Sequence, residues 1–159
     1  MTKWLFSHQL LEVNMLIEIR KEPFNAYAEI QSYLDKLDMD GQYGATASFV
    51  GSMRDFNEDK KVTYMTLEHY PGMTEKHLEA IAKGAMENWQ LLDLLILHRI
   101  GKVKISEDIV LVATWSAHRK DAFESCRAIM EQLKSGAPFW KKEETSSGSQ
   151  WVEKNTPGY

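Results

Sequence analysis

The sequence contains one cysteine, Cys126, among 159 residues. A single thiol excludes an intramolecular disulfide and a metal cluster held by the cysteines of one chain. This scarcity is typical of proteins from a reducing compartment, so we expect a cytoplasmic location. Cys126 falls on the apolar face of a predicted helix, where cysteine is more often a small core residue than a nucleophile.

Long apolar runs and an excess of basic residues are also missing. No segment reaches the roughly 18 consecutive apolar residues that a membrane-spanning helix requires. The formal net charge is −4, which argues against the basic surface field of nucleic-acid-binding proteins. We therefore expect neither a membrane nor a nucleic acid among the partners. A composition of 43% hydrophobic and 26% charged residues predicts a globular domain rather than a disordered chain.

The common motifs for metals, nucleotides and acyl transfer do not occur. The histidines show no H-x-x-x-H spacing, and the sequence has no phosphate-binding glycine loop, no dinucleotide fingerprint and no G-x-S-x-G turn. His69 and His98 lie in predicted strands, where packing or hydrogen bonding is a more common role than metal binding. We expect no metal and no cofactor.

The periodicity of apolar residues predicts an alternation of helices and strands. Spacings of three and four residues predict helices over 23–37, 74–89 and 117–135. Alternating or continuous apolar runs predict strands over 15–21, 45–53, 62–70, 91–100, 109–115 and 139–143. Gly101 indicates a turn, and the polar segments 38–44, 54–61 and 144–150 indicate loops. This alternation predicts an α/β or α+β fold.

The chain shows no repeat and no linker, so we expect one domain over residues 15–159. Residues 1–14 match no recognisable pattern. They are interpreted as an N-terminal extension, either disordered or left over from expression, and not as a secretion signal.

The segment Ser116-Ala117-His118-Arg119 stands where an apolar strand meets the last predicted helix. Ser116 is a plausible N-cap, which would place Arg119 in the first helical turn. A cation there opposes the helix dipole, and a bound anion would compensate for it together with His118 and free backbone N–H groups. Alternatively, Arg119 pairs with Asp121 or Glu124, or extends into water.

The end of the same helix and the strand after it contain three lysines, Lys134, Lys141 and Lys142. A lysine at a helix C-terminus commonly does no more than complement the dipole, and lysines on a strand are commonly solvated. Phe139 and Trp140 beside them could, however, form a pocket wall for a flat heterocycle. A lysine held against apolar walls or near another cation has a lowered pKa and can act in catalysis near neutral pH.

Arg54 is a third candidate, because it follows a predicted strand directly and begins a polar loop. Arginines in this position often bind anionic ligands, although a surface role is more common. Asp55 comes next, and we expect it to face away from any phosphate.

Four segments of the chain together resemble one family. Residues 66–75 read Thr-Leu-Glu-His-Tyr-Pro-Gly-Met-Thr-Glu, and residues 133–141 contain Leu-Lys and Ala-Pro-Phe-Trp-Lys. With His-Arg-Ile-Gly at 98–101 and Ser-Ala-His-Arg at 116–119, these segments resemble the large, catalytic subunit of molybdopterin synthase. The resemblance covers roughly residues 17–154.

This resemblance implies an α+β fold, described as an α/β hammerhead with an additional antiparallel sheet. It implies a sulfurtransferase of molybdenum cofactor biosynthesis that converts cyclic pyranopterin monophosphate (precursor Z) into the dithiolene of molybdopterin. The sulfur would come from the C-terminal Gly-Gly thiocarboxylate of a small ubiquitin-like carrier subunit. The large subunit would form the homodimeric core of a heterotetramer.

The resemblance also implies roles for single residues. Lys134 would lie nearest the thiocarboxylate, and Lys141 would be the second lysine of the pocket. The substrate would be bound by Arg54, His118, Arg119 and Lys154. Lys154 and Asn155 follow Trp-Val-Glu at a place where family members often carry a basic residue, and either could replace it.

Two other functions remain open at this point. A binding module could use the same phosphate pocket only to hold a pterin or a nucleotide. A scaffold could bind the ubiquitin-like partner without turnover. The presence of both Lys134 and Lys141 favours the enzyme, because a protein that only binds needs no such pair.

Overall fold

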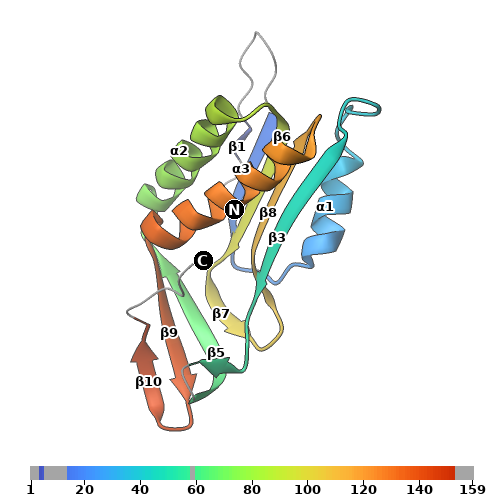
Figure 1. The fold of residues 1–159 in the computed structure, drawn as a ribbon. Coiled ribbons are helices and arrows are strands. Elements are labelled where there is room, and N and C mark those ends of the chain that lie inside the picture. Colours follow the sequence, from blue (N-terminus) through green and yellow to red (C-terminus); the bar gives the residue numbers. More distant parts are fainter. Residues whose placement is uncertain (1–3, 6–13, 58–59, 153–159) are drawn as a thin grey trace.

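The computed structural model describes residues 4–5, 14–57 and 60–152, which form three helices and ten strands. The strands make two sheets of five strands each. Figure 1 shows the first sheet between two layers of helices and the second sheet extending beyond the ends of those helices. The fold is α+β, as the sequence predicts.

The first sheet has the strand order β1-β2-β6-β8-β3. Its strands are β1 (Trp4–Leu5), β2 (Asn14–Arg20), β6 (Leu91–Arg99), β8 (Asp108–Ser116) and β3 (Ala45–Ser52). Strands β2 and β6 are parallel, whereas the other neighbours are antiparallel. The central strand β6 is buried along nearly its whole length, which explains its continuous apolar run.

Helices cover both faces of this sheet. α2 (Met73–Asn88) and α3 (Arg119–Gly136) pack on one face, and α1 (Ala26–Leu34) packs on the other (Figure 1). Successive side chains of β6 point to opposite faces of the sheet. Leu94 belongs to the core under α2 and α3, and Leu95 belongs to the core under α1. This alternation is the period of two expected of a strand.

The second sheet is built from β4 (Phe56–Asn57), β5 (Lys60–His69), β7 (Gly101–Lys104), β9 (Phe139–Thr145) and β10 (Gly148–Trp151). Its order is β10-β9-β5-β4, with β7 also paired to β5. All of the pairs are antiparallel. One face covers a small separate core of Met53, Val62, Met65, Leu67 and Val103.

Three strands of this sheet correct the sequence prediction, and the first is β4, which lies in the loop predicted over 54–61. The residue predicted to begin a turn, Gly101, is the start of β7, and its positive φ of 79° is a conformation that glycine adopts readily where the chain passes from β6 of the first sheet to β7 of the second. The polar tract predicted over 144–150 contains the hairpin of β9 and β10, with a φ of 120° at Gly148. All three strands are short, and β10 is largely exposed, so none shows a strong apolar pattern.

The N-terminal segment contributes a short edge strand, since Trp4 and Leu5 pair with Ile17 and Leu16 of β2. The rest of the predicted extension, apart from Asn14, lies outside the described residues. None of the helices in the described part of the chain has the length and hydropathy needed to cross a bilayer.

Candidate functional site

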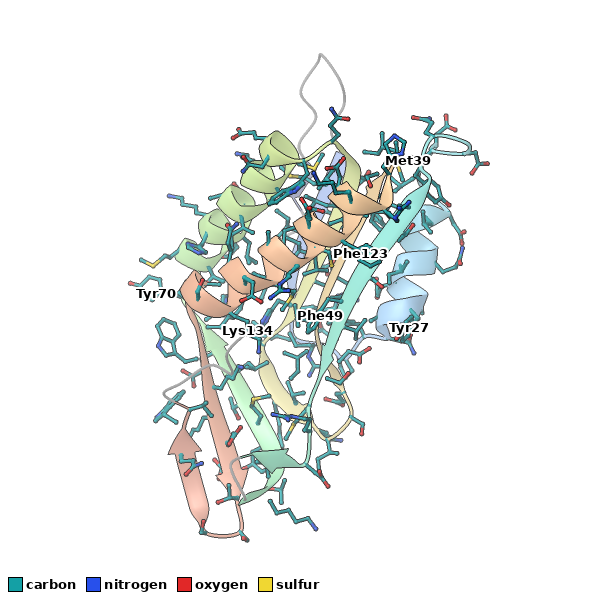
Figure 2. All side chains as sticks on the ribbon, in the orientation of Figure 1. Tyr27, Met39, Phe49, Tyr70, Phe123 and Lys134 are labelled. Carbon is teal, nitrogen blue, oxygen red and sulfur yellow. The ribbon has the colours of Figure 1, made fainter. Side chains whose placement is uncertain are left out.

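A small pocket lies where the C-terminal end of α3 meets the junction of the two sheets. It measures about 110 Å³ and brings together Lys134 of α3, Lys141 of β9 and His98 of β6. Figure 2 shows Lys134 below α3, at the level where the second sheet begins. The other lining residues are Phe49, Gly51, Ser52, Ile109, Val110, Met130, Leu133, Ala137 and Phe139.

The local sequence explains how both lysines reach this pocket. Lys134 stands in the last turn of α3, and the helix ends where Ala137 adopts an extended conformation (φ −68°, ψ 132°), as expected of a residue before proline. The chain then reverses into β9, whose alternating side chains place Lys141 on the pocket side. Lys142 lies on the opposite face, with its Nζ 5.9 Å from the centre of the Trp151 ring.

The two lysines influence each other directly. The pKa of Lys141 is lowered to about 8, first by burial and then by the charge of Lys134 and a hydrogen bond with it, while Glu143 acts in the opposite direction. An amine with this pKa is present in both its charged and its neutral form near neutral pH. The pocket can therefore accept and donate a proton without a carboxylate or a metal.

His98 forms one wall of the pocket in a neutral state. Its ring stacks on Phe139, with centroids 3.7 Å apart and planes 11° apart, and its Nδ1 lies 2.8 Å from the carbonyl oxygen of Arg99. The pKa of His98 is lowered to about 4 by burial and by the neighbouring Lys141, Lys134 and His69, against a raising effect of the Arg99 contact. The sequence identified His98 as a packing or hydrogen-bonding residue but gave no signal that it borders the lysines.

The aromatic pair predicted as a pocket wall is divided between two faces. Phe139 lines the pocket, whereas Trp140 points away and is 47% exposed. Phe49 of β3 completes the wall and is 42% exposed. Sequence reasoning missed Phe49, because nothing local distinguishes it from a surface residue of an edge strand.

His118 and Arg119 lie at the opposite end of α3 from Lys134, and both are exposed. At about 1.5 Å per residue, the helix separates His118 from Lys134 by about 24 Å. Ser116 is not the N-cap, since His118 holds that position and the Ser116 hydroxyl donates to the His118 carbonyl at 2.7 Å. Within the described part of the chain, Arg119 forms no ion pair with Asp121 or any other carboxylate.

The remaining predicted residues lie outside the pocket lining. Arg54 is exposed and follows the pocket residue Ser52 by two positions. Asp55 is exposed as well. Lys154 and Asn155 lie outside the described residues.

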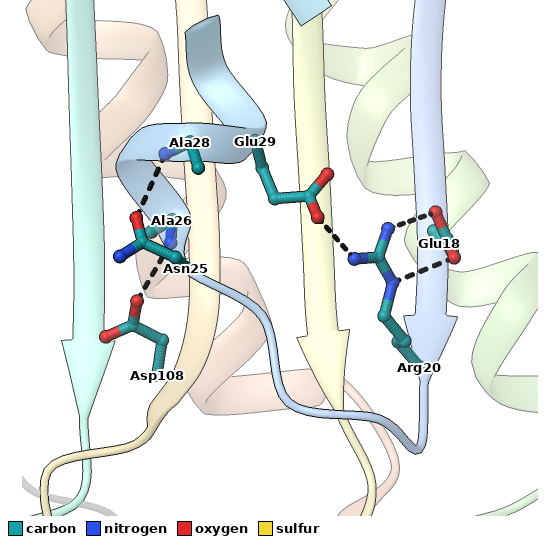
Figure 3. A network of polar contacts seen from close by, with 7 residues as sticks. All are labelled: Glu18, Arg20, Asn25, Ala26, Ala28, Glu29 and Asp108. Atoms are coloured by element: carbon teal, nitrogen blue, oxygen red, sulfur yellow. Dashed lines mark hydrogen bonds and ion pairs between the residues drawn. The ribbon is translucent and has the colours of Figure 1, made fainter. Parts of the chain in front are cut away.

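A second cavity of about 360 Å³ contains none of the predicted catalytic residues. Two of its basic side chains lie beside carboxylates: Arg20 pairs with Glu18 at 2.9 Å and with Glu29 at 2.5 Å, and His69 lies 3.7 Å from Glu75. Figure 3 shows Arg20 between the two carboxylates. The smaller pocket is therefore the better candidate for chemistry, because its two lysines face each other.

Cys126 is confirmed as a core residue. It is buried, its thiol lies 3.9 Å from the carbonyl oxygen of Val112, and burial raises its pKa to about 11. A thiol with that pKa stays protonated at neutral pH and is a poor nucleophile. Any sulfur chemistry at this protein must use sulfur that another molecule supplies.

These features define a class of protein: an α+β domain with a two-lysine pocket between two sheets, suited to group transfer on an anionic ligand. Comparison with known proteins identifies the family to which this domain belongs. The sequence profile of the MoaE protein family matches residues 19–136. A molybdopterin synthase catalytic subunit from Ralstonia nicotianae is 54% identical over 112 residues, which cover 70% of this chain and 64% of that relative.

Solved structures agree with this match. Molybdopterin synthase from Staphylococcus aureus superposes with a TM-score of 0.75 at 34% identity, covering 86% of this chain and 96% of that one. A complex of subunits 1 and 2 of molybdopterin-converting factor from Helicobacter pylori shares the fold, with a TM-score of 0.73 at 21% identity. The chain belongs to the MoaE family, the catalytic subunits of molybdopterin synthase, which are sulfurtransferases of molybdenum cofactor biosynthesis.

Proposed function

We propose that this chain transfers sulfur from the C-terminal thiocarboxylate of a small ubiquitin-like carrier to cyclic pyranopterin monophosphate, which yields the molybdopterin dithiolene. The observation that supports this most directly is the pairing of Lys134 and Lys141 in one pocket. Sulfur addition to the pterin side chain needs proton transfers near neutral pH, and this pair offers an ammonium and an amine side by side.

The two lysines have different roles because they lie on different elements. Lys134 extends from the helix end into the pocket and assists the attack on the pterin side chain or transfers protons. Lys141 is held on a strand and positions or polarises the substrate. The burial that lowers the pKa of Lys141 also strengthens its interaction with a bound anion, because the charge is less screened by water.

The phosphate group of the substrate requires cations, and among the described residues two of the predicted ones do not reach the lysine pocket of their own chain. His118 and Arg119 are separated from Lys134 by the length of α3. We therefore infer that they act on the pocket of a second copy, in a homodimer that carries one carrier subunit at each end. Arg54 and Lys154 would add to the same phosphate site. No cofactor or metal takes part in this scheme, and a reducing cytoplasm would keep the carrier's sulfur available.

A reconstituted sulfur-transfer assay tests this function. Purified chain is mixed with cyclic pyranopterin monophosphate and thiocarboxylated carrier, and molybdopterin is detected by the fluorescence of its oxidised derivative. We expect product with the wild type and none above background with Lys134→Ala, while carrier binding stays intact. Lys142→Ala is the matched control, since Lys142 lies on the other face of β9, and it should retain activity.

Two outcomes would contradict the proposal. Full activity of Lys134→Ala would remove the central residue from the mechanism. Carrier binding by the wild type without any product would favour the scaffold function instead.

A further inference from the structure

The lysine pocket is rich in hydrogen-bond donors and poor in acceptors. Lys134 and Lys141 donate hydrogen bonds when they are charged, and among the lining side chains only Ser52 and His98 carry other nitrogen or oxygen atoms. The Ser52 hydroxyl donates to Asp108 at 2.9 Å, and its oxygen keeps lone pairs that can accept. A ligand with N–H or O–H groups therefore meets two side-chain acceptors in this lining, Ser52 and His98, whereas a charged lysine only donates.

The backbone contact of His98 fixes which ring nitrogen can accept. Nδ1 lies 2.8 Å from the carbonyl oxygen of Arg99, and a carbonyl oxygen only accepts, so Nδ1 carries the hydrogen. In the neutral ring Nε2 then carries the lone pair. Among the described residues, no side chain or backbone group forms a hydrogen bond with Nε2.

The surroundings of His98 hold this acceptor in one orientation. The ring lies flat against Phe139 at 3.7 Å, which fixes its plane, and the contact with Arg99 fixes its rotation in that plane. Burial and the two nearby lysine charges disfavour protonation of the ring. The lysines thus preserve the lone pair on Nε2 while they serve the negatively charged parts of a ligand.

We propose that His98 contacts the substrate directly, and that its Nε2 accepts a hydrogen bond from an N–H or O–H group of the cyclic pyranopterin monophosphate. This inference rests on the proposed function. A reduced pterin carries ring N–H groups, an exocyclic amine and hydroxyls, and its phosphate and carbonyl oxygens suit the cations. The pocket thus offers donors to the oxygen atoms of the substrate and an acceptor to its N–H and O–H groups. His98 would therefore contribute to substrate specificity.

Two substitutions separate this role from simple packing. His98→Phe keeps an aromatic face for Phe139 but has no acceptor, whereas His98→Gln keeps an acceptor but loses the ring. We expect His98→Phe to raise the dissociation constant for cyclic pyranopterin monophosphate about 5- to 50-fold, because a donor of the bound ligand is left unpaired. His98→Gln should bind more tightly than His98→Phe, and affinity for the carrier should stay unchanged in both variants.

The binding experiment uses calorimetry on full-length chains, with melting temperatures recorded to verify folding. Wild-type affinity of His98→Phe would overturn the proposal. So would an equal loss in both variants, which indicates packing alone, and so would a loss confined to carrier binding. Turnover by the wild type is measured in the same preparation as a control. If the proposed function itself were wrong, the wild type would neither bind the substrate nor turn it over, which distinguishes that case from a failure of the His98 proposal alone.

A measurement on the wild type covers the case that His98→Phe does not fold. The chain has five histidines, and their ring nitrogens can be followed by nuclear magnetic resonance with ¹⁵N-labelled histidine. We expect the His98 Nε2 resonance to shift when the pyranopterin is added and to stay in place when the carrier alone is added. An unchanged His98 Nε2 resonance on addition of the pyranopterin would overturn the proposal.

Discussion

At the scale of single residues, the chemistry of the pocket depends on two ammonium groups that share a partly buried space. Lys141 costs free energy when charged, because water is partly excluded and the charge of Lys134 repels it. The cost is visible at Lys141, whose pKa is lowered to about 8. A lowered lysine pKa means that the folded state binds fewer protons than the unfolded state between about pH 8 and 10.5. This pocket therefore destabilises the fold most below pH 8, as functional sites often do.

Removal of one lysine should change the titration of the other. In Lys134→Met, the pKa of Lys141 should rise above 8 but stay below its ordinary value of 10.5, because the charge and hydrogen bond of Lys134 are lost while burial remains. The measurement is a titration of ¹³C-labelled lysine ε-carbons by nuclear magnetic resonance. Lys142→Met is the control and should leave Lys141 unchanged, since Lys142 faces Trp151. An unchanged Lys141 in Lys134→Met would show that the lysines are not coupled.

At the scale of secondary-structure elements, a polar contact joins α1 to the centre of the first sheet. The Tyr33 hydroxyl donates to Asp93 of β6 at 2.7 Å, and the Tyr33 ring lies 5.6 Å from that of Trp115. Asp93 is 1% exposed, and its other carboxylate oxygen has no partner among the described residues. Burial raises the pKa of Asp93 to about 7, although the hydrogen bonds from Tyr33 and Leu94 lower it.

This contact predicts a pH dependence of stability. A raised carboxyl pKa means that the folded state binds more protons than the unfolded state, so stability should fall as pH rises from about 4 to 7 and stay low above that. Asp93→Asn mimics the protonated form, so its stability should depend less on pH than that of the wild type. At pH 8 its free energy of unfolding should exceed that of the wild type by about 1–4 kcal/mol. Urea unfolding at pH 5 and pH 8 measures this difference.

The exposed Asp40 offers a matched control, and Asp40→Asn should behave like the wild type at both pH values. Loss of stability in Asp93→Asn at pH 8 would show that the carboxylate is stabilised by Tyr33 more than burial penalises it.

At the scale of the whole molecule, α3 separates two groups of cations that the proposed reaction needs together. Lys134 lies at one end of the helix, and His118 and Arg119 lie at the other. A rigid helix of this length cannot bend to bring them onto one small substrate. A symmetric dimer solves this problem, because each copy can supply the cations that the pocket of the other copy lacks.

Mixed dimers test this arrangement. We expect Lys134→Ala and the double variant His118→Ala/Arg119→Ala to be inactive alone. When the two are unfolded and refolded together, random assortment should restore about a quarter of wild-type activity, because half of the dimers then contain one intact site of two. Tagged chains and two-step purification would isolate the mixed dimers for the sulfur-transfer assay. Absence of activity in folded mixed dimers would place both groups of cations in a site formed by one chain.

Sequence periodicity predicted the larger elements of this fold because it reports interactions over a few residues. The apolar run of β6 and the helical spacing of α2 and α3 were sufficient to locate these elements to within a few residues. The strands β4, β7 and β10 were missed, since they are short and gain their order from pairing with β5 and β9. Edge pairing is a property of the assembled sheet, and no local pattern records it.

Some features of the candidate site could likewise be predicted from the sequence, and others could not. The sequence by itself determined that Lys134 and Lys141 are candidates, that Cys126 belongs to the core, and which family the chain resembles, because residue identities and spacings suffice for these conclusions. Only the tertiary structure decided that Lys134 meets Lys141 and His98 while His118 and Arg119 lie far away along α3. Burial, the distance between charges and the choice of ring nitrogen in His98 all arise from contacts between distant segments, so they exist only once the two sheets and α3 have packed together.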